Sequence, residues 1–147
     1  MKSQKQIQVL VLNAENAIAG KLSACAAKSA LQGVEVKIIN SEKAVITGDK
    51  DYIVTRYFNK REQKNKANPE ESFKLSRRPD LFLKKMIKGM LPKHNRTGSD
   101  AEQRITCYYG NPENLKAETF KYTGDKVKGK LTSIESICIA LGWKNNA

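Results

Sequence analysis

Residues 7–39, IQVLVLNAENAIAGKLSACAAKSALQGVEVKII, decide the fold of this chain. The first six are almost continuously apolar, which is typical of a strand buried on both faces of a parallel sheet. Residues 17–31 are rich in alanine and leucine and predict a helix, which Asn16 can cap and Gly33 can end. Residues 34–39 predict a second strand. A strand–helix–strand unit of about 30 residues favours parallel pairing with a right-handed crossover.

Two further helices follow from apolar periodicity. A helix is predicted over residues 50–61, with Asp49 as its cap. We expect one face of it to enter the core, and that face carries Ile53, Val54, Tyr57 and Phe58. A second helix is predicted from Pro79 to Met90 and ends before Pro92, because proline is favourable in a first turn and disfavours helix before it.

The remaining segments are shorter. The polar stretches 62–78 and 111–130 predict loops, and residues 105–109 predict a strand. A helical turn is predicted to start at Ser99. Thr132-Ser133-Ile134-Glu135 matches the capping box, in which the first and fourth residues cap each other, and it predicts a final helix. The apolar face of that helix carries Ile134, Ile137, Cys138 and Leu141.

Size and composition predict one domain over residues 1–147. The chain has 147 residues, of which 39% are hydrophobic and 29% charged, so it can form a single core. Its net charge of +12 indicates a polyanionic partner, for which nucleic acid is the commonest candidate. No apolar run approaches the roughly 20 residues that span a bilayer, and the first residues do not resemble a signal peptide. We therefore expect a cytosolic protein with no membrane partner.

The residues needed for catalysis or metal binding are sparse. Three widely spaced cysteines, Cys25, Cys107 and Cys138, predict neither a disulfide framework nor a metal site, and His94 is the only histidine. The turn after the first strand has a single glycine, at its end, so it lacks the phosphate-binding fingerprint of nucleotide enzymes. We expect no catalytic residue, no cofactor and no small-molecule substrate.

The positive charge is concentrated in residues 56–96. This stretch holds thirteen lysines and arginines against four acids, and thus most of the net charge of +12. Because phosphate contacts release counterions, such a cluster favours binding to RNA. We expect His94 to contact phosphate as well, since its neighbours are basic. The predicted RNA-binding residues are Arg56, Lys60, Arg61, Lys64, Lys66, Lys74, Arg77, Arg78, Lys84, Lys85, Lys88, Lys93, His94 and Arg96.

The helix over 79–90 shows how this surface can form. Its apolar side chains cover an arc of roughly 140° and its three lysines an arc of roughly 100° on the other side. One face can therefore pack on the core while Lys84, Lys85 and Lys88 face a ligand or simply solvent. Among the aromatic residues of the basic stretch, Phe73 lies in a predicted loop and is the candidate for stacking on a base.

Several segments together resemble the universal large-subunit ribosomal protein family numbered thirteen. Residues 18–23 (IAGKLS) resemble its Gly-Arg-Leu-Ala-Ser helix start, and residues 40–48 (NSEKAVITG) resemble its Asn-Ala-Glu-Lys-Ala-Val-Ile-Ser-Gly. Residues 88–92 (KGMLP) are similar to its Arg-Gly-Met-Leu-Pro signature. Three further segments stand where that family has them, namely 77–80, 107–110 and 134–143. The likeness is collinear over roughly residues 7–143.

The resemblance implies a three-layer α/β/α domain around a mostly parallel sheet, with basic loop extensions. It also implies a non-catalytic structural role in the large ribosomal subunit, where the domain would bind rRNA beside neighbouring ribosomal proteins and support assembly and translation. The short link at Gln32-Gly33 resembles the archaeal and eukaryotic branch, and the end at Ala147 is closer to archaeal members. Glu70, Glu71 and Ser72 depart from the family pattern before Phe73.

Two other function classes remain open from sequence alone. A free-standing RNA-binding regulator would bind an isolated RNA outside the ribosome. An enzyme with a nucleotide pocket at the ends of the strands would bind nucleotide in titration, although the missing glycine-rich loop argues against it.

Overall fold

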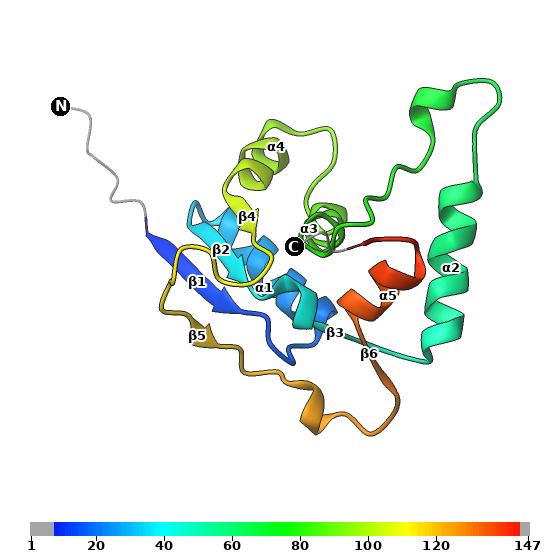
Figure 1. The fold of residues 1–147 in the computed structure, drawn as a ribbon. Coiled ribbons are helices and arrows are strands. Elements are labelled where there is room, and N and C mark those ends of the chain that lie inside the picture. Colours follow the sequence, from blue (N-terminus) through cyan, green and yellow to red (C-terminus); the bar gives the residue numbers. More distant parts are fainter. Residues whose placement is uncertain (1–7, 145–147) are drawn as a thin grey trace.

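The chain begins with the predicted strand–helix–strand unit (Figure 1). In a computed structural model that describes residues 8–144, β1 (Val9–Asn13) is followed by α1 (Ala19–Leu31) and β2 (Glu35–Ile39). The two strands pair in parallel along their whole length. The predicted α/β class is therefore confirmed, while Ile7, the first residue of the predicted strand, lies outside the described residues.

Two more parallel strands complete the main sheet. β4 (Ile105–Cys107) pairs with β2, and β5 (Glu118–Thr119) pairs with β1, which gives the order β4-β2-β1-β5. The strand predicted over 105–109 thus ends two residues early. The segment 111–130, predicted to be irregular, contains β5 and the 3-10 turn η3 (Gly124–Lys126). Both residues of β5 are exposed, so no apolar alternation marked it in the sequence.

The two faces of the main sheet differ in what covers them. Leu12, Ile38 and Cys107 are neighbours in register, and their face packs against α1, α3 (Pro79–Gly89) and α4 (Arg96–Gln103). On the opposite face Lys37 is half-buried, and its Nζ donates to Glu113 Oε2 at 3.1 Å. This second face is covered in part by the loop after β4, which carries Glu113.

A second, smaller sheet is antiparallel and connects the main sheet to the helices α2 (Lys50–Glu62) and α5 (Ile134–Ala140). β3 (Val45–Thr47) pairs with β6 (Leu131–Ser133), and α5 continues directly from β6. α5 packs against α3 and against α2, which forms the edge of the molecule in Figure 1. The short 3-10 turns η1 (Ser41–Lys43) and η2 (Pro69–Glu71) complete the elements. The helices predicted over 50–61 and 79–90 are confirmed within a residue.

The apolar faces of these helices are mostly buried as predicted. Phe82, Leu83 and Ile87 of α3 are fully buried, and so are Ile134, Ile137 and Cys138 of α5. In α2 only Ile53 is buried, and Phe58, which the periodicity placed on the core face, is 53% exposed. α2 packs mainly on the short helix α5, so its apolar arc is covered only in part.

The helix starts differ in detail from the predictions. α4 begins at Arg96 after Asn95, rather than at Ser99. The last helix is capped by Ser133, whose Oγ accepts from Ser136 N at 3.3 Å, because Thr132 lies in β6 and donates to Gly48 O. Asp49 is the N-cap residue of α2 as predicted, although its carboxylate accepts from Lys130 Nζ at 2.7 Å instead of from a helix N–H. Asn16 donates to Asp125 and does not cap α1.

Candidate nucleic-acid interface

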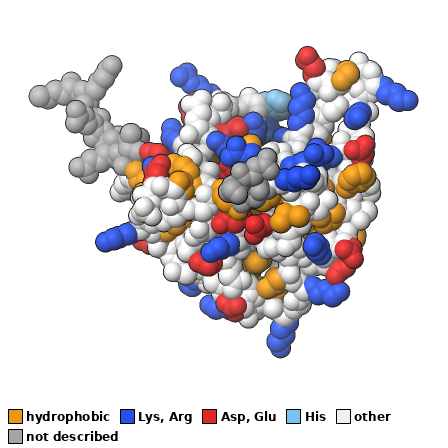
Figure 2. Space-filling view, viewed as in Figure 1, with side chains coloured by type: hydrophobic (Ala, Val, Ile, Leu, Met, Phe, Trp, Pro, Cys, Tyr) orange, Lys and Arg blue, Asp and Glu red, His pale blue; other side chains and the backbone are white. Residues whose placement is uncertain are grey.

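A groove of about 880 Å³ runs between α2, α3 and α4. Its floor is made largely by α3, whose half-buried Met86 faces the groove above the buried Phe82. One wall comes from α2 and the loop that follows it, and the other from residues 91–96 and α4. In the space-filling view the groove appears as a notch in the upper part of the molecule (Figure 2).

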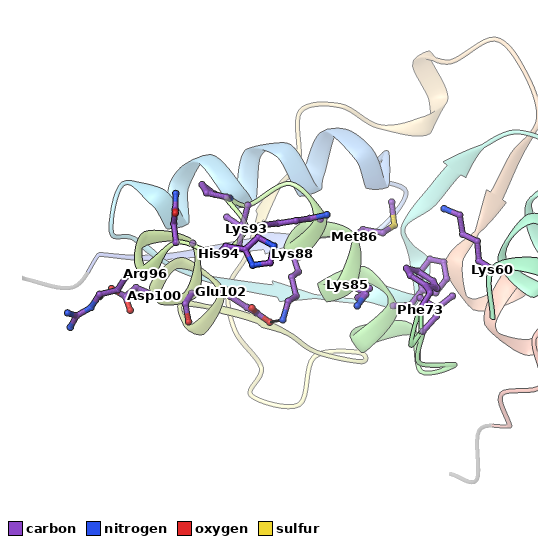
Figure 3. A pocket seen from close by; sticks show the side chains of 18 of the residues that line it. Lys60, Phe73, Lys85, Met86, Lys88, Lys93, His94, Arg96, Asp100 and Glu102 are labelled. Atoms are coloured by element: carbon purple, nitrogen blue, oxygen red, sulfur yellow. Dashed lines mark ion pairs between the residues drawn. The ribbon is translucent and has the colours of Figure 1, made fainter. Parts of the chain in front are cut away.

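Basic side chains from three parts of the chain line this groove (Figure 3). Lys60 comes from α2, and Lys85 and Lys88 come from α3. Lys93 and His94 come from the segment that leads into α4, and Arg96 is the first residue of α4. Six of the fourteen residues predicted to bind RNA therefore share one surface, and they are Lys60, Lys85, Lys88, Lys93, His94 and Arg96. His94 is exposed and has a left-handed backbone, with φ of 61°, which turns the chain into α4.

Phe73 lies between two of these ammonium groups. Lys60 Nζ is 5.7 Å and Lys85 Nζ is 5.4 Å from the centre of its ring, and Figure 3 shows the two lysines on either side of it. The ring remains 39% exposed, which keeps it the candidate for base stacking that the sequence indicated. These cation–π contacts join the loop to α2 and α3, and Leu75, two residues further on, is buried in the core.

Tyr57 supports this arrangement from below. Its ring meets the buried Phe82 edge to face at 4.9 Å, and Lys60 Nζ lies 5.8 Å from its centre. Burial raises the pKa of the Tyr57 hydroxyl, so it is a neutral phenol at physiological pH. The prediction that Tyr57 joins the core is confirmed, since it packs against the core cluster.

Two acids also line the groove, and the sequence reasoning missed them. Glu102 Oε1 forms an ion pair with Lys88 Nζ at 2.8 Å, and Asp100 lies 4.0 Å from Arg96 in the same helix. The spacing of Arg96 and Asp100 could have been found, since helical residues four apart are neighbours. Nothing in the sequence pairs Lys88 with Glu102, because they lie on different helices that come together through packing on α1 and β4.

Arg78 has a structural partner. Its guanidinium donates two hydrogen bonds to Asp80, from Nε at 3.2 Å and from Nη2 at 2.7 Å. The carboxylate of Asp80 is nearly buried in the first turn of α3, whereas the arginine is mostly exposed. A buried carboxylate requires hydrogen-bond donors, so Arg78 stabilises the start of α3 and is less available for phosphate than its neighbours.

The other predicted residues lie outside the groove. Lys84 is on the β4 side of α3, where burial raises the pKa of the Cys107 thiol to about 12 and Lys84 opposes that effect. Arg77 lies beside Gly142, at the end of α5. The remaining residues lie on α2 or in the loop between α2 and α3, and they are Arg56, Arg61, Lys64, Lys66 and Lys74. All of these except Arg61 are exposed.

The cysteines behave mainly as apolar side chains. Cys138 is buried, while Cys25 and Cys107 are half-buried, and all three are free thiols. Within residues 8–144, no cluster of three or more His, Cys, Asp or Glu side chains could hold a metal ion. Over the same residues, no helix is long and apolar enough to cross a membrane.

The chain is similar to a family of known proteins. Residues 7–114 match the family model described as Ribosomal protein L13. The large ribosomal subunit protein uL13 of Methanocaldococcus jannaschii is 41% identical over 131 residues, which cover 88% of this chain and 91% of the relative. The protein of the same name from Saccharolobus solfataricus is 32% identical over 148 aligned positions, covering 97% and 99%. That from Thermoplasma acidophilum is 34% identical over 132, covering 90% and 92%.

Proposed function

This chain belongs to the ribosomal protein L13 family, and from that membership we propose that its groove and basic loops bind large-subunit rRNA. The family resemblance predicted from the sequence is confirmed. The chain is a structural, non-catalytic component of the large ribosomal subunit. The basic surface then has a defined role, which is to hold the folded rRNA and support subunit assembly and translation.

One observation carries the rRNA proposal. Five lysine and arginine side chains from three helices and one loop converge on a single groove that also contains two acids, which leaves an excess of three positive charges in it. Because like charges around one concave surface repel one another, the groove has a positive potential that a counter-charge would offset. Phosphates of a folded RNA supply that counter-charge, and the exposed basic residues of the 63–78 loop extend the surface beyond the groove.

The proposal predicts a specific salt dependence. Each phosphate contact contributes about −0.7 to −0.9 to the slope of log affinity against log salt concentration. A triple variant Lys60→Gln, Lys85→Gln, Lys93→Gln is therefore expected to reduce the magnitude of that slope by about 2 when binding to transcribed large-subunit rRNA is measured by filter retention. The matched control neutralises three exposed lysines far from the groove, and they are Lys121, Lys126 and Lys128.

The two triple variants carry the same net charge, so only position distinguishes them. If both variants lose the same affinity and slope, the effect is one of overall charge and the groove is not the interface. A gradient of cell lysate gives the second readout, in which the wild type migrates with the large subunit after a high-salt wash. Migration of the wild type at the top of the gradient in low and high salt would favour a free-standing RNA-binding regulator.

A further inference from the structure

We propose that the groove receives one unpaired nucleotide of the rRNA, whose base stacks on Phe73 while Lys60 and Lys85 contact its phosphate and the phosphate of the next nucleotide. This inference rests on the proposed rRNA binding and names the part of the RNA that the groove takes. The bases of a duplex are stacked on one another and cannot enter such a groove, whereas the bases of loops and bulges can be splayed out.

The first support is the composition of the groove. A site that only neutralised phosphates would need cations on an open surface. This groove also has an aromatic and apolar interior, formed by Tyr57, Phe73, Leu75, Phe82 and Met86. Aromatic rings beside basic side chains are the combination that binds single-stranded nucleic acid, because the rings stack on bases while the cations follow the backbone.

The second support is the state of Phe73 in the free protein. Phe73 is more than one-third exposed, and the ammonium nitrogens of Lys60 and Lys85 lie 5.7 Å and 5.4 Å from the centre of its ring. A base that stacks on the ring displaces one of these ammonium groups, and the phosphate of the same nucleotide then provides it with a stronger partner. The lysines thus keep the ring in place before binding and contact the backbone afterwards.

The third support is size. A volume of about 880 Å³ lies within the range of pockets that enclose small organic ligands, so it can hold a base with its ribose and phosphate. An acidic peptide from a neighbouring ribosomal protein would pair with the lysines but would leave the aromatic interior without a stacking partner. The observations therefore favour the nucleotide.

The test compares two substitutions that both keep the groove filled. Phe73→Leu removes the π surface, and Phe73→Trp enlarges it. Loss of one stacked base is expected to weaken binding of Phe73→Leu to transcribed large-subunit rRNA by about 5- to 150-fold. The salt slope should stay unchanged, since no cation is removed. Phe73→Trp should bind at least as tightly as wild type. The matched control is Phe58→Leu, because Phe58 is an exposed aromatic residue of α2 outside the groove.

The outcomes separate this inference from the proposed function. If wild-type protein binds rRNA with a steep salt dependence and Phe73→Leu binds equally well, base stacking is excluded while rRNA binding stands. If wild-type protein does not bind the rRNA at all, both fail. If Phe73→Leu binds naked rRNA normally but is lost from large subunits in a gradient, a protein neighbour occupies the groove and the nucleotide is excluded. Thermal melting of each variant confirms that it is folded.

Discussion

Replacing Gly98 with alanine should distort the wall of the groove. Gly98 lies in the first turn of α4 and is buried, and a Cβ built on it would stand 2.0 Å from Pro92 O and 3.0 Å from the carbonyl carbon of Pro92. Close carbon–oxygen contacts are about 3.3 Å or longer, so the two backbone segments must separate by more than about 1 Å. The obstacle is backbone, so no side-chain rotation can relieve it.

The expected free energy follows from two opposing effects. Alanine favours the helical conformation over glycine by up to ~1 kcal/mol. Forcing extra volume into a packed site opposes this by about 1–3 kcal/mol, or more where backbone must move. Gly98→Ala should therefore lower the free energy of unfolding by about 1–2 kcal/mol. A protein of this size then melts roughly 2–4 °C lower per kcal/mol.

Gly89→Ala is the matched control. Gly89 is in the last turn of α3, lines the same groove, and has no atom within 4 Å of its hypothetical Cβ. It should gain up to ~1 kcal/mol from helix propensity and melt at or above the wild-type temperature. Circular dichroism melts of the two variants give the comparison. If Gly98→Ala melts as high as Gly89→Ala, the close approach of Pro92 to α4 is not a constraint on the folded protein.

Three further predictions test individual side chains. Glu102→Gln removes a negative charge from the groove and frees Lys88, so the affinity for rRNA at low salt should rise about 2- to 5-fold. The control variant Glu118→Gln, on exposed β5, should leave that affinity unchanged. Arg78→Ala deprives the nearly buried Asp80 carboxylate of two hydrogen bonds and should lower the free energy of unfolding by about 1–2 kcal/mol, as measured by thermal melting. Unchanged melting together with weaker rRNA binding would instead indicate that this arginine binds phosphate. Burial raises the pKa of the Cys107 and Cys138 thiols to about 12, so both stay protonated at pH ~8 and iodoacetamide should label them much more slowly in the folded protein than in the unfolded protein. Rapid labelling of either thiol in folded protein, read by mass spectrometry, would contradict the raised pKa.

The raised pKa values of Cys107 and Cys138 also predict how the stability of the fold changes with pH. A folded-state pKa above the unfolded value means that the unfolded chain loses its proton first as the pH rises. The two buried thiols therefore contribute fully to the free energy of unfolding below their ordinary pKa of about 8.5. That contribution declines as the pH rises from there towards 12. Melts in this range should shift less for a Cys138→Ala variant than for wild type.

Local periodicity was enough to predict most of the architecture. The apolar run before Asn13, the alanine-rich helix and the second strand predicted the parallel unit, because each depends on residues close together in the chain. The amphipathic helix α3 followed from the same kind of pattern. By contrast, β5 has two exposed residues and is a strand only through its pairing with β1, so no local pattern could reveal it.

The candidate site, too, was predicted only in part from the sequence. The excess of lysine and arginine over residues 56–96 is visible in the sequence, and six of the predicted residues line the groove. Which of those residues share the groove depends on packing. Lys84 and Lys85 are adjacent in the chain, but a helix separates successive side chains by about 100°, so only Lys85 lines the groove once the apolar face of α3 is buried.

Contacts between distant segments also determine which basic side chains form ion pairs within the protein and which remain available for RNA. The packing of α3 against β4 and α1 places Lys88 beside Glu102, and the burial of Asp80 engages Arg78. The loop that carries Phe73 returns to α2 and α3, and there the ring meets two ammonium groups. Composition and spacing thus specify how much positive charge the surface has. Its arrangement into a groove with an aromatic interior depends on long-range packing, because burial of the apolar faces sets the relative positions of the helices.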